Sequence, residues 1–411
     1  MPPRSMIELG LSAATEHFAA ELADPKDSAP DWTAFEWQMA RAAAVLHGVT
    51  PLLGGTLKWI GPPSWQSFML EQRRQTQLRY QRIAAVLEAI DARATAAGLA
   101  IVALKGAALH ALRVYSAGER PMADIDLLVR PADAAHAVQM LAALGYVQTA
   151  VTWKHQVFEP RDGAGEKATM AALPVGEHQD YPVKIELHTR IMERLPLTEV
   201  EITERVFPAH PKPGLNFYPS IHALLLHLLL HATGNMSARA LRLMHLHDIA
   251  RLAARMSPDD WELLVDSRAT PQALWWALPP LEMINRYQPG RVPARVLAAL
   301  RAECPGVLRR LSRRTNLSQM SYASLSIPAL PGLPWCRSLS ERGRYAWRRV
   351  VPGREQAATR QIMAAEQWSA QRPWTHMSQR RRILQWLFRR PARDASMYIV
   401  RAILESPRTC G

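Results

Sequence analysis

The strongest constraint on the fold is an abrupt change of periodicity at Gly98. Before this glycine, apolar residues recur at helical spacing, and the longest amphipathic stripe covers residues 83–94. Directly after it, residues 99–104 read Leu-Ala-Ile-Val-Ala-Leu, a continuous apolar run that is typical of a buried strand. The chain must therefore join a long helical region to a β-sheet.

Strand and helix signals then alternate over about a hundred residues. The pattern predicts strands over 99–104, 124–129, 146–150, 155–159 and 183–188, and helices over 106–115 and 131–144. Helical spacing returns from about Pro219. We therefore predict an α+β fold, with a small mixed β-sheet between helical regions. The expected parts are an N-terminal helical region (1–98), an α/β core (99–215), a helical domain (216–300) and an Arg-rich helical C-terminal region (301–411).

Positive charge is concentrated at the C-terminal end. The chain has 50 Lys and Arg against 36 Asp and Glu, and residues 301–411 contain 21 Arg but only 6 acidic residues. An anionic partner, either nucleic acid or a membrane surface, is therefore expected mainly in this region. Its densest segment, 380–390, also fits a helix that packs its apolar residues onto the protein while its arginines stay in solvent.

The cysteines and the N-terminal sequence indicate the cellular compartment in which the protein is expected. Cys304, Cys336 and Cys410 are far apart, which supports neither a disulfide framework nor a thiolate zinc site. The N-terminus lacks the basic and apolar pattern of a signal peptide, and no apolar stretch is long enough for a membrane span. We expect a soluble, cytoplasmic protein.

The acidic pair Asp124 and Asp126 is the sharpest local feature. Residues i and i+2 of a strand share one face, so the two carboxylates would lie side by side while Ile125 points into the core. Paired carboxylates suit hard cations such as Mg²⁺, with phosphate oxygens completing the coordination. The alternative is that the two aspartates simply lie on a solvent-exposed strand edge and carry no chemistry.

Two further segments would complete a phosphate site. Lys105 and Gly106 lie where a buried strand meets a helix, and backbone N–H groups at such a junction attract anions. Glu186 shares a polar strand face with Lys184 and His188, so it offers a third carboxylate for a metal or a base. An ordinary surface lysine, a turn glycine and a solvent-facing strand explain the same residues without any chemistry.

These residues together resemble a known family. Leu104-Lys105-Gly106, the run from Arg120 through Asp124-Ile-Asp126 to Val129, Leu144-Gly145-Tyr146 and Glu186-Leu187-His188 look like the uncharacterised nucleotidyltransferase family of the polymerase-β-like superfamily. The resemblance extends over residues 30–255.

The resemblance implies a fold, an activity and roles for individual residues. Such proteins have a small mixed sheet and transfer a nucleoside monophosphate from an NTP, such as ATP, to a hydroxyl-bearing acceptor, here a small molecule, peptide or protein. Asp124, Asp126 and Glu186 would be the catalytic, Mg²⁺-binding carboxylates, with room for two ions. Lys105 and Gly106 would bind the nucleotide. Arg120 would add a guanidinium for phosphate, because Lys105-Gly106-Ala107 replaces the usual Gly-Ser turn.

Two alternatives remain open from the sequence. His227 and His231 lie four residues apart on a predicted helix, with His245, His247 and Asp248 nearby, so they form a rival zinc site. Buried, hydrogen-bonded core histidines are the commoner explanation of such a pattern. The second alternative is a non-catalytic nucleotide- or RNA-binding protein that keeps the nucleotidyltransferase fold.

Overall fold

A six-stranded mixed sheet holds the centre of the protein. The computed structural model describes residues 1–161, 175–266, 273–326, 328–351, 353, 378–388 and 392–405. The strand order is β3-β4-β5-β2-β1-β8; the β2–β5 and β1–β8 pairs are parallel and the other pairs are antiparallel. The strands are β1 (Ala100–Ala103), β2 (Asp124–Leu128), β3 (Tyr146–Val151), β4 (His155–Pro160), β5 (Lys184–His188) and β8 (Gly214–Asn216), and a separate hairpin comprises β6 (Met192–Leu195) and β7 (Thr198–Glu201).

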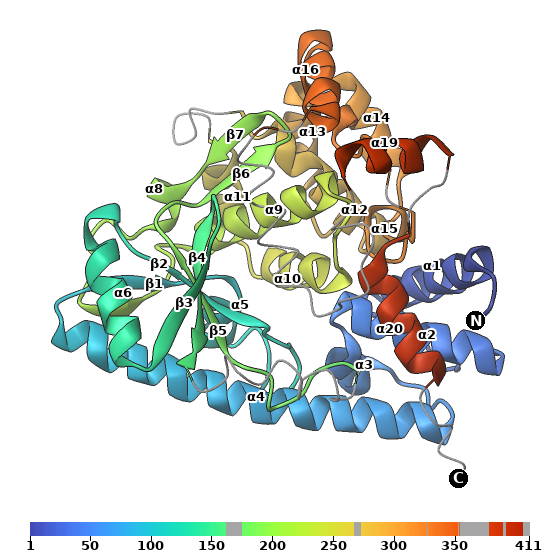
Figure 1. The fold of residues 1–411 in the computed structure, drawn as a ribbon, viewed down its shortest axis with the longest axis horizontal. Coiled ribbons are helices and arrows are strands. Elements are labelled where there is room, and N and C mark those ends of the chain that lie inside the picture. The colour runs from blue at the N-terminus through green and yellow to red at the C-terminus, as the bar shows by residue number, and fades with distance from the viewer. Residues whose placement is uncertain are drawn as a thin grey trace.

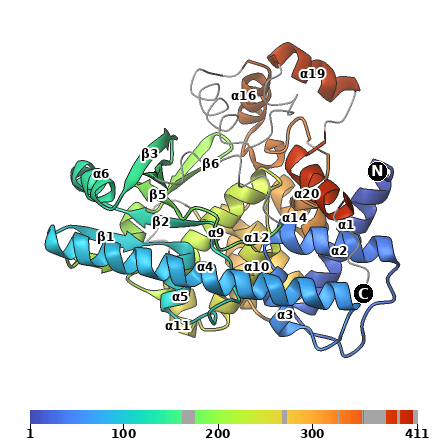
Figure 2. The same ribbon diagram turned by 60° about the horizontal axis from the view of Figure 1, so that its bottom comes forward.

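Period-two alternation gives the two middle strands an apolar and a polar face. Ile125 and Leu127 of β2 are fully buried and pack in one cluster with Ile185 of β5 and Ile83 of α4 (Pro63–Ala96). Helix α4 runs the length of the molecule past the sheet (Figure 1, Figure 2). The even-numbered residues of β2 and β5 therefore point away from α4, toward the helical body.

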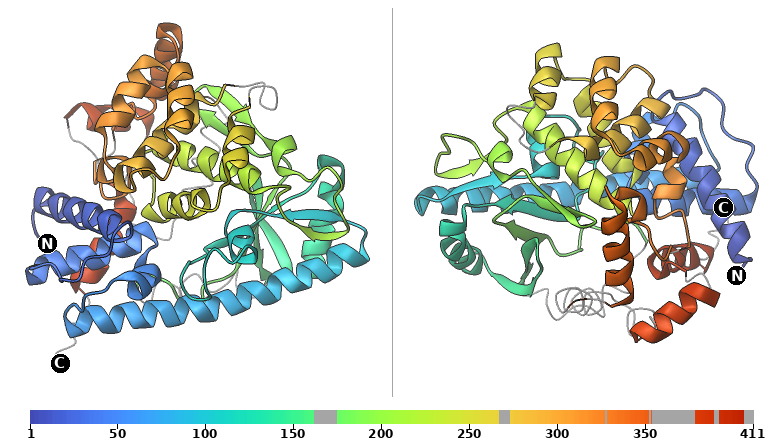
Figure 3. Two further views of the ribbon diagram at one scale, coloured as in Figure 1. Left: turned by 180° about the vertical axis from the view of Figure 1, so that it is seen from behind. Right: turned by 90° about the horizontal axis from the view of Figure 1, so that it is seen from above.

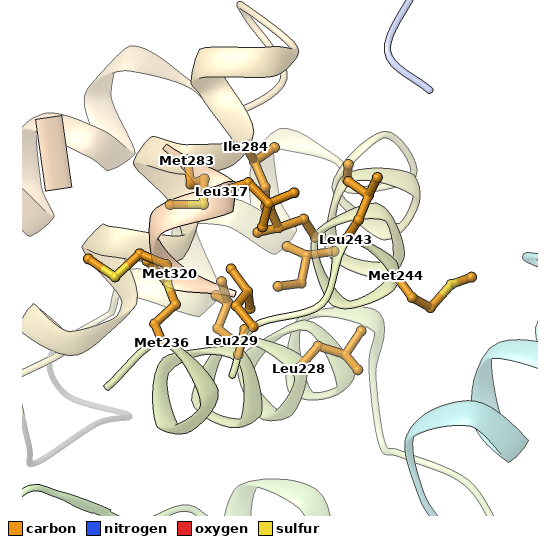
Figure 4. Packing of buried hydrophobic residues seen from close by; sticks show 14 of the residues in the cluster. Leu228, Leu229, Met236, Leu243, Met244, Met283, Ile284, Leu317 and Met320 are labelled. Atoms are coloured by element: carbon orange, nitrogen blue, oxygen red, sulfur yellow. The ribbon is translucent and has the colours of Figure 1, made fainter. Parts of the chain in front are cut away.

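The helical body is built around one hydrophobic cluster that joins elements from both ends of the chain. In Figure 4, Leu229 and Met236 of α9 (Ile221–Ser237) lie close to Met320 of α15 (Leu317–Met320). Helix α20 (Asp394–Glu405) packs beside α2 (Ala34–His47) (Figure 1, Figure 3). The other helices are α1 (Arg4–Glu21), α3 (Thr50–Thr56), α5 (Lys105–Ala111), α6 (Ala134–Ala143), α8 (Thr203–Val206), α10 (Leu243–Ala253), α11 (Pro258–Val265), α12 (Leu278–Tyr287), α13 (Ala294–Glu303), α14 (Gly306–Arg314), α16 (Leu339–Val350) and α19 (Gln379–Phe388), with 3₁₀ turns at Pro131–Asp133, Trp275–Ala277 and Leu333–Trp335.

The predicted α+β class is confirmed, with a mixed sheet flanked by helices. All five predicted strands form, and the long helix ends at Ala96, just before Gly98. Strand β8 and the β6–β7 hairpin were not predicted, because their three or four residues carry too short a pattern. The division into four parts stays a prediction.

The basic C-terminal segment forms a helix over its described part. In α19, Arg380 and Arg381 are exposed whereas Arg382 is buried, so the arginines do not all face solvent. Arg389 and Arg390 of this segment, and Cys410, lie outside the described residues. The anionic partner stays a prediction. Among the helices that the structure describes, none is long and apolar enough to cross a bilayer.

His47 joins three helices at a fully buried position. Its Nδ1 accepts the backbone N–H of Leu243 at 2.9 Å, and its Nε2 lies 3.0 Å from the Thr15 hydroxyl. That hydroxyl donates to the carbonyl of Leu11 at 2.7 Å, so Nε2 carries the proton and donates to it. Burial, followed by the positive charge of Arg242, lowers the pKa of His47 to about 3.

We expect this histidine to make the protein sensitive to acid. The unfolded chain protonates His47 below the ordinary histidine pKa of 6.5, whereas the folded chain does not until about pH 3, so stability falls as the pH drops through that window. At pH 4.5 the loss from this group is about 3 kcal/mol. Urea unfolding at pH 7.5 and pH 4.5 should show a smaller pH dependence for His47→Gln than for the native chain. An equal pH dependence for the two proteins would contradict this assignment.

Candidate active site

A cavity of about 600 Å³ separates the polar face of the sheet from the helical body. Its sheet side carries the acidic residues of β2 and β5, and its helical side carries residues of α9 and α10. All six residues singled out from the sequence line it, namely Lys105, Gly106, Arg120, Asp124, Asp126 and Glu186. The fold thus brings together segments that lie far apart in the chain.

The three carboxylates are positioned by strand geometry. Asp124 and Asp126 are two residues apart on β2, and Asp126 is directly in register with Glu186 on the parallel neighbour β5. Burial, followed by the negative charges of Asp126 and Glu186, raises the pKa of Asp124. The carboxylates therefore repel one another, and a cation between them would be stabilised.

Lys105 partly neutralises this acidic cluster. Its Nζ lies 2.7 Å from Oδ1 of Asp126, and both side chains are largely buried. Burial favours the neutral form of Asp126, but the Lys105 ammonium and His188 together outweigh it and hold the pKa of this carboxyl well below its usual range. The backbone N–H of Lys105 donates to the Tyr218 hydroxyl at 3.1 Å, which in turn lies 2.7 Å from Nδ1 of His227 on α9. The strand-to-helix junction is thereby tied to the helical body.

Two histidines that had no assigned role flank Glu186. His188 follows it on β5, and its Nε2 lies 3.1 Å from Oδ1 of Asp126 and 3.7 Å from Oε2 of Glu186. His155, from β4, places Nδ1 3.2 Å from the same Oε2. Within the described part of the chain, one set of three possible metal ligands has its ligand atoms within 4.8 Å of one another: His155, Glu186 and His188. The three predicted carboxylates do not form such a set.

Arg120 is held by a buried acidic residue from α10. Its Nε and Nη2 donate to Oδ1 and Oδ2 of Asp248 at 2.8 and 2.7 Å, and the Tyr115 hydroxyl donates to Oδ1 as well at 2.8 Å. The ion-pair partner of Arg120 is therefore Asp248, 128 residues away, and not Asp124, which is close to it in the sequence. A phosphate role for Arg120 stays a prediction.

Arg79 of α4 is a positioning residue that sequence reasoning missed. Its guanidinium donates to the carbonyls of Met122 and Ala123 before β2, and to those of Tyr181 and Pro182 before β5. It therefore fixes the starts of the two strands that carry the carboxylates. A signal was present, since Arg79 lies four residues before Ile83 in the apolar stripe of the long helix.

Among the described residues, the ligand atoms of His227, His231, His245, His247 and Asp248 do not come together as a three-ligand group, although the rings of His231 and His245 are in contact. His227 bonds Tyr218, and His231 bonds Asn235 within α9 at 3.2 Å. His247 contacts the ring of Tyr115 instead. Burial lowers the pKa of all three, so they are neutral side chains of the core and the cavity wall.

Gly106 leaves room for the Arg120 side chain. A Cβ at this position would lie 2.6 Å from Nη1 of Arg120 and 3.1 Å from Cγ of Met122. Because two hydrogen bonds hold Arg120, we expect Gly106→Ala to destabilise the protein by about 1–3 kcal/mol. Thermal unfolding measures this loss, with Gly343→Ala on α16 as the control, since a Cβ there meets nothing within 4 Å. Equal melting temperatures for the two variants would contradict the close approach.

One comparison with known proteins identifies a family for this chain. A family described as "Uncharacterised nucleotidyltransferase" matches residues 33–287, which include the whole sheet and the helices that wall the cavity. No curated protein and no solved structure matches the chain. Since the match covers more than half of the sequence, the chain belongs to the uncharacterised nucleotidyltransferase family.

Proposed function

We propose that the protein transfers a nucleoside monophosphate from an NTP to a hydroxyl-bearing acceptor, a small molecule, peptide or protein, in a reaction that depends on Mg²⁺. The family indicates nucleotidyl transfer in general. The observation that carries the finer proposal is the placement of Asp124, Asp126 and Glu186 on one polar sheet face that lines a cavity.

The donor set fits a hard dication. Three carboxylates supply oxygen ligands, and burial, followed by the negative charges of Asp126 and Glu186, raises the pKa of Asp124. Asp124, Asp126 and Glu186 would hold Mg²⁺, which when bound would neutralise charge on the phosphates and the departing pyrophosphate. In the reaction, the acceptor hydroxyl would give up its proton to a carboxylate of the site, for which Glu186 is a candidate. Its oxygen bonds to the α-phosphorus, and the bond from the α-phosphorus to the bridging oxygen breaks to release pyrophosphate.

The chain's own cations would orient the triphosphate. Lys105, Arg120 and Lys154 line the cavity but already pair with Asp126, Asp248 and Glu193, respectively. Arg242, which precedes α10, also lines the cavity and is exposed, and within the described part of the chain it forms no ion pair. We therefore assign Arg242 to the triphosphate. For Lys105 and the backbone at Gly106 we keep the nucleotide-binding role that the family resemblance implies.

Nucleotide binding and turnover test this proposal separately. Binding of each of the four α,β-methylene NTP analogues to the full chain should strengthen when Mg²⁺ is added. Pyrophosphate release from the natural NTPs should require Mg²⁺ and an acceptor, supplied as panels of small alcohols, peptides and proteins. If the affinity for the analogues does not change with Mg²⁺ and no pyrophosphate is released, a non-catalytic nucleotide- or RNA-binding protein would be favoured.

A further inference from the structure

The imidazoles beside Glu186 change what this part of the site can bind. We propose that His155, Glu186 and His188 form a site for a first-row transition-metal dication that prefers imidazole ligands, such as Zn²⁺, next to the oxygen-rich Mg²⁺ position. The inference deepens the proposed function, on which it rests in one respect only: Glu186 would serve both metals.

The spacing of the three side chains matches the shell of a single ion. Ligands about 2.1 Å from a tetrahedral metal lie about 3.4 Å from one another. The distances from Oε2 of Glu186 to Nδ1 of His155 and to Nε2 of His188 are 3.2 and 3.7 Å, and all three ligand atoms lie within 4.8 Å of one another. Small side-chain rotations would complete the shell.

The strands make this arrangement rigid. His155 of β4 is directly in register with His188 on the antiparallel strand β5, and their ring centroids are 5.0 Å apart. Glu186 lies two residues before His188, so both side chains share one strand face. Three ligands on adjacent hydrogen-bonded strands are preorganised, because no loop must close to assemble them.

Nδ1 of His155 gives a second, independent indication. This atom is buried and makes no hydrogen bond within the described part of the chain, although it lies 3.2 Å from Oε2 of Glu186. A buried ring nitrogen without a hydrogen bond costs free energy, and a metal ion would satisfy it. Three protein ligands also leave a coordination position for water or a phosphate oxygen, as in catalytic metal sites.

The ligand chemistry separates this site from the Mg²⁺ position. Imidazole nitrogen suits Zn²⁺, Cu²⁺, Ni²⁺ and iron, whereas Mg²⁺ prefers carboxylate, phosphate and water oxygens. Oδ1 of Asp126 already accepts from Lys105, and Nε2 of His188 lies nearer to this oxygen, at 3.1 Å, than to Oε2 of Glu186, at 3.7 Å. A metal bound by Nε2 of His188 would therefore replace its hydrogen bond to Asp126, while Glu186 is the carboxylate that both histidines approach. The two positions would therefore take different ions and share one carboxylate.

Cobalt serves as the probe, because Co²⁺ replaces Zn²⁺ and absorbs visible light according to its coordination. The full chain is dialysed against a chelator and titrated with Co²⁺ in the presence of excess Mg²⁺, without nucleotide. We expect one tight site per chain whose spectrum Zn²⁺, but not Mg²⁺, abolishes. His155→Gln should weaken Co²⁺ binding at least about tenfold, and His188→Gln likewise.

The control is His136→Gln, which changes an exposed histidine of α6 in the same part of the chain. His188 also bonds Asp126, so His155→Gln carries the test if His188→Gln unfolds. Co²⁺ binding that Mg²⁺ displaces, or that both active-site variants retain, would overturn the inference.

The two proposals fail in different ways. Mg²⁺-dependent nucleotide binding with no tight Co²⁺ site would remove the histidine site and leave the proposed function standing. A tight Co²⁺ site that His155→Gln abolishes, in a protein that neither binds NTP analogues nor releases pyrophosphate, would keep the metal site and remove the function.

Discussion

Asp126→Asn should reduce nucleotidyl transfer by at least about 100-fold while leaving the shape of the side chain unchanged. Asp126 lies at the centre of the site, where it accepts from Lys105 and His188 and is in register with Glu186. An amide keeps the volume but removes the charge that would hold a dication. The measurement is pyrophosphate release under saturating NTP and Mg²⁺.

Controls separate lost chemistry from lost folding. Asp259→Asn changes an exposed carboxylate on α11 and should leave the rate unchanged. Because Asp126→Asn removes the carboxylate that pairs with the buried Lys105 ammonium, its melting temperature must be measured, and the rate compared well below it. An Asp126→Asn protein that is folded and releases pyrophosphate at the native rate would exclude a metal role for this residue.

Local patterns were sufficient to predict the faces of β2. The alternation of Asp124, Ile125, Asp126 and Leu127 predicts two carboxylates on one face and two apolar side chains on the other, and the apolar pair is indeed fully buried. This prediction succeeded because a strand's period of two depends only on neighbouring residues. The same reasoning placed Glu186 and His188 on one face of β5.

The pairing of strands that lie far apart in the chain could not be predicted from local sequence patterns. The direct register of Asp126 with Glu186 depends on β5 lying parallel to β2, and no local pattern specifies that neighbour. His155 was assigned to a predicted strand but not to the site, because only the β4–β5 register brings it beside His188. The sequence around a histidine in a strand does not indicate which residue of the neighbouring strand it will contact.

Arg120 shows the same limit for a charged pair. Its partner, Asp248, lies 128 residues away on a helix, although Glu119 and Asp124 are acidic residues close to Arg120 in the sequence. One signal was available, since Asp248 is an acidic residue among apolar residues of α10 and is almost completely buried. Buried acids need a partner, which indicates a paired cation without identifying it.

Removing one partner of the Arg120–Asp248 ion pair should lower the free energy of unfolding strongly, because the other partner is left buried without its counter-charge. Asp248→Ala leaves the Arg120 guanidinium and the Tyr115 hydroxyl buried without their acceptor. We expect a loss of about 3–5 kcal/mol in the free energy of unfolding, measured by urea denaturation. Arg120→Met should cost a similar amount, because it leaves the carboxylate of Asp248 without its cation.

The double variant Arg120→Met/Asp248→Leu decides what the pair does. Removing both charges removes both desolvation penalties, so the double variant should be clearly more stable than either single variant. If the loss of unfolding free energy in the double variant equals the sum of the losses in the two single variants, the two residues are not coupled.

The folded double variant also tests the role of Arg120 in nucleotide binding. If its Mg²⁺-dependent affinity for NTP analogues equals that of the native chain, Arg120 serves the fold alone. A weakened affinity in a stable double variant would instead assign its remaining N–H groups to phosphate, since Arg120 lines the cavity over Gly106.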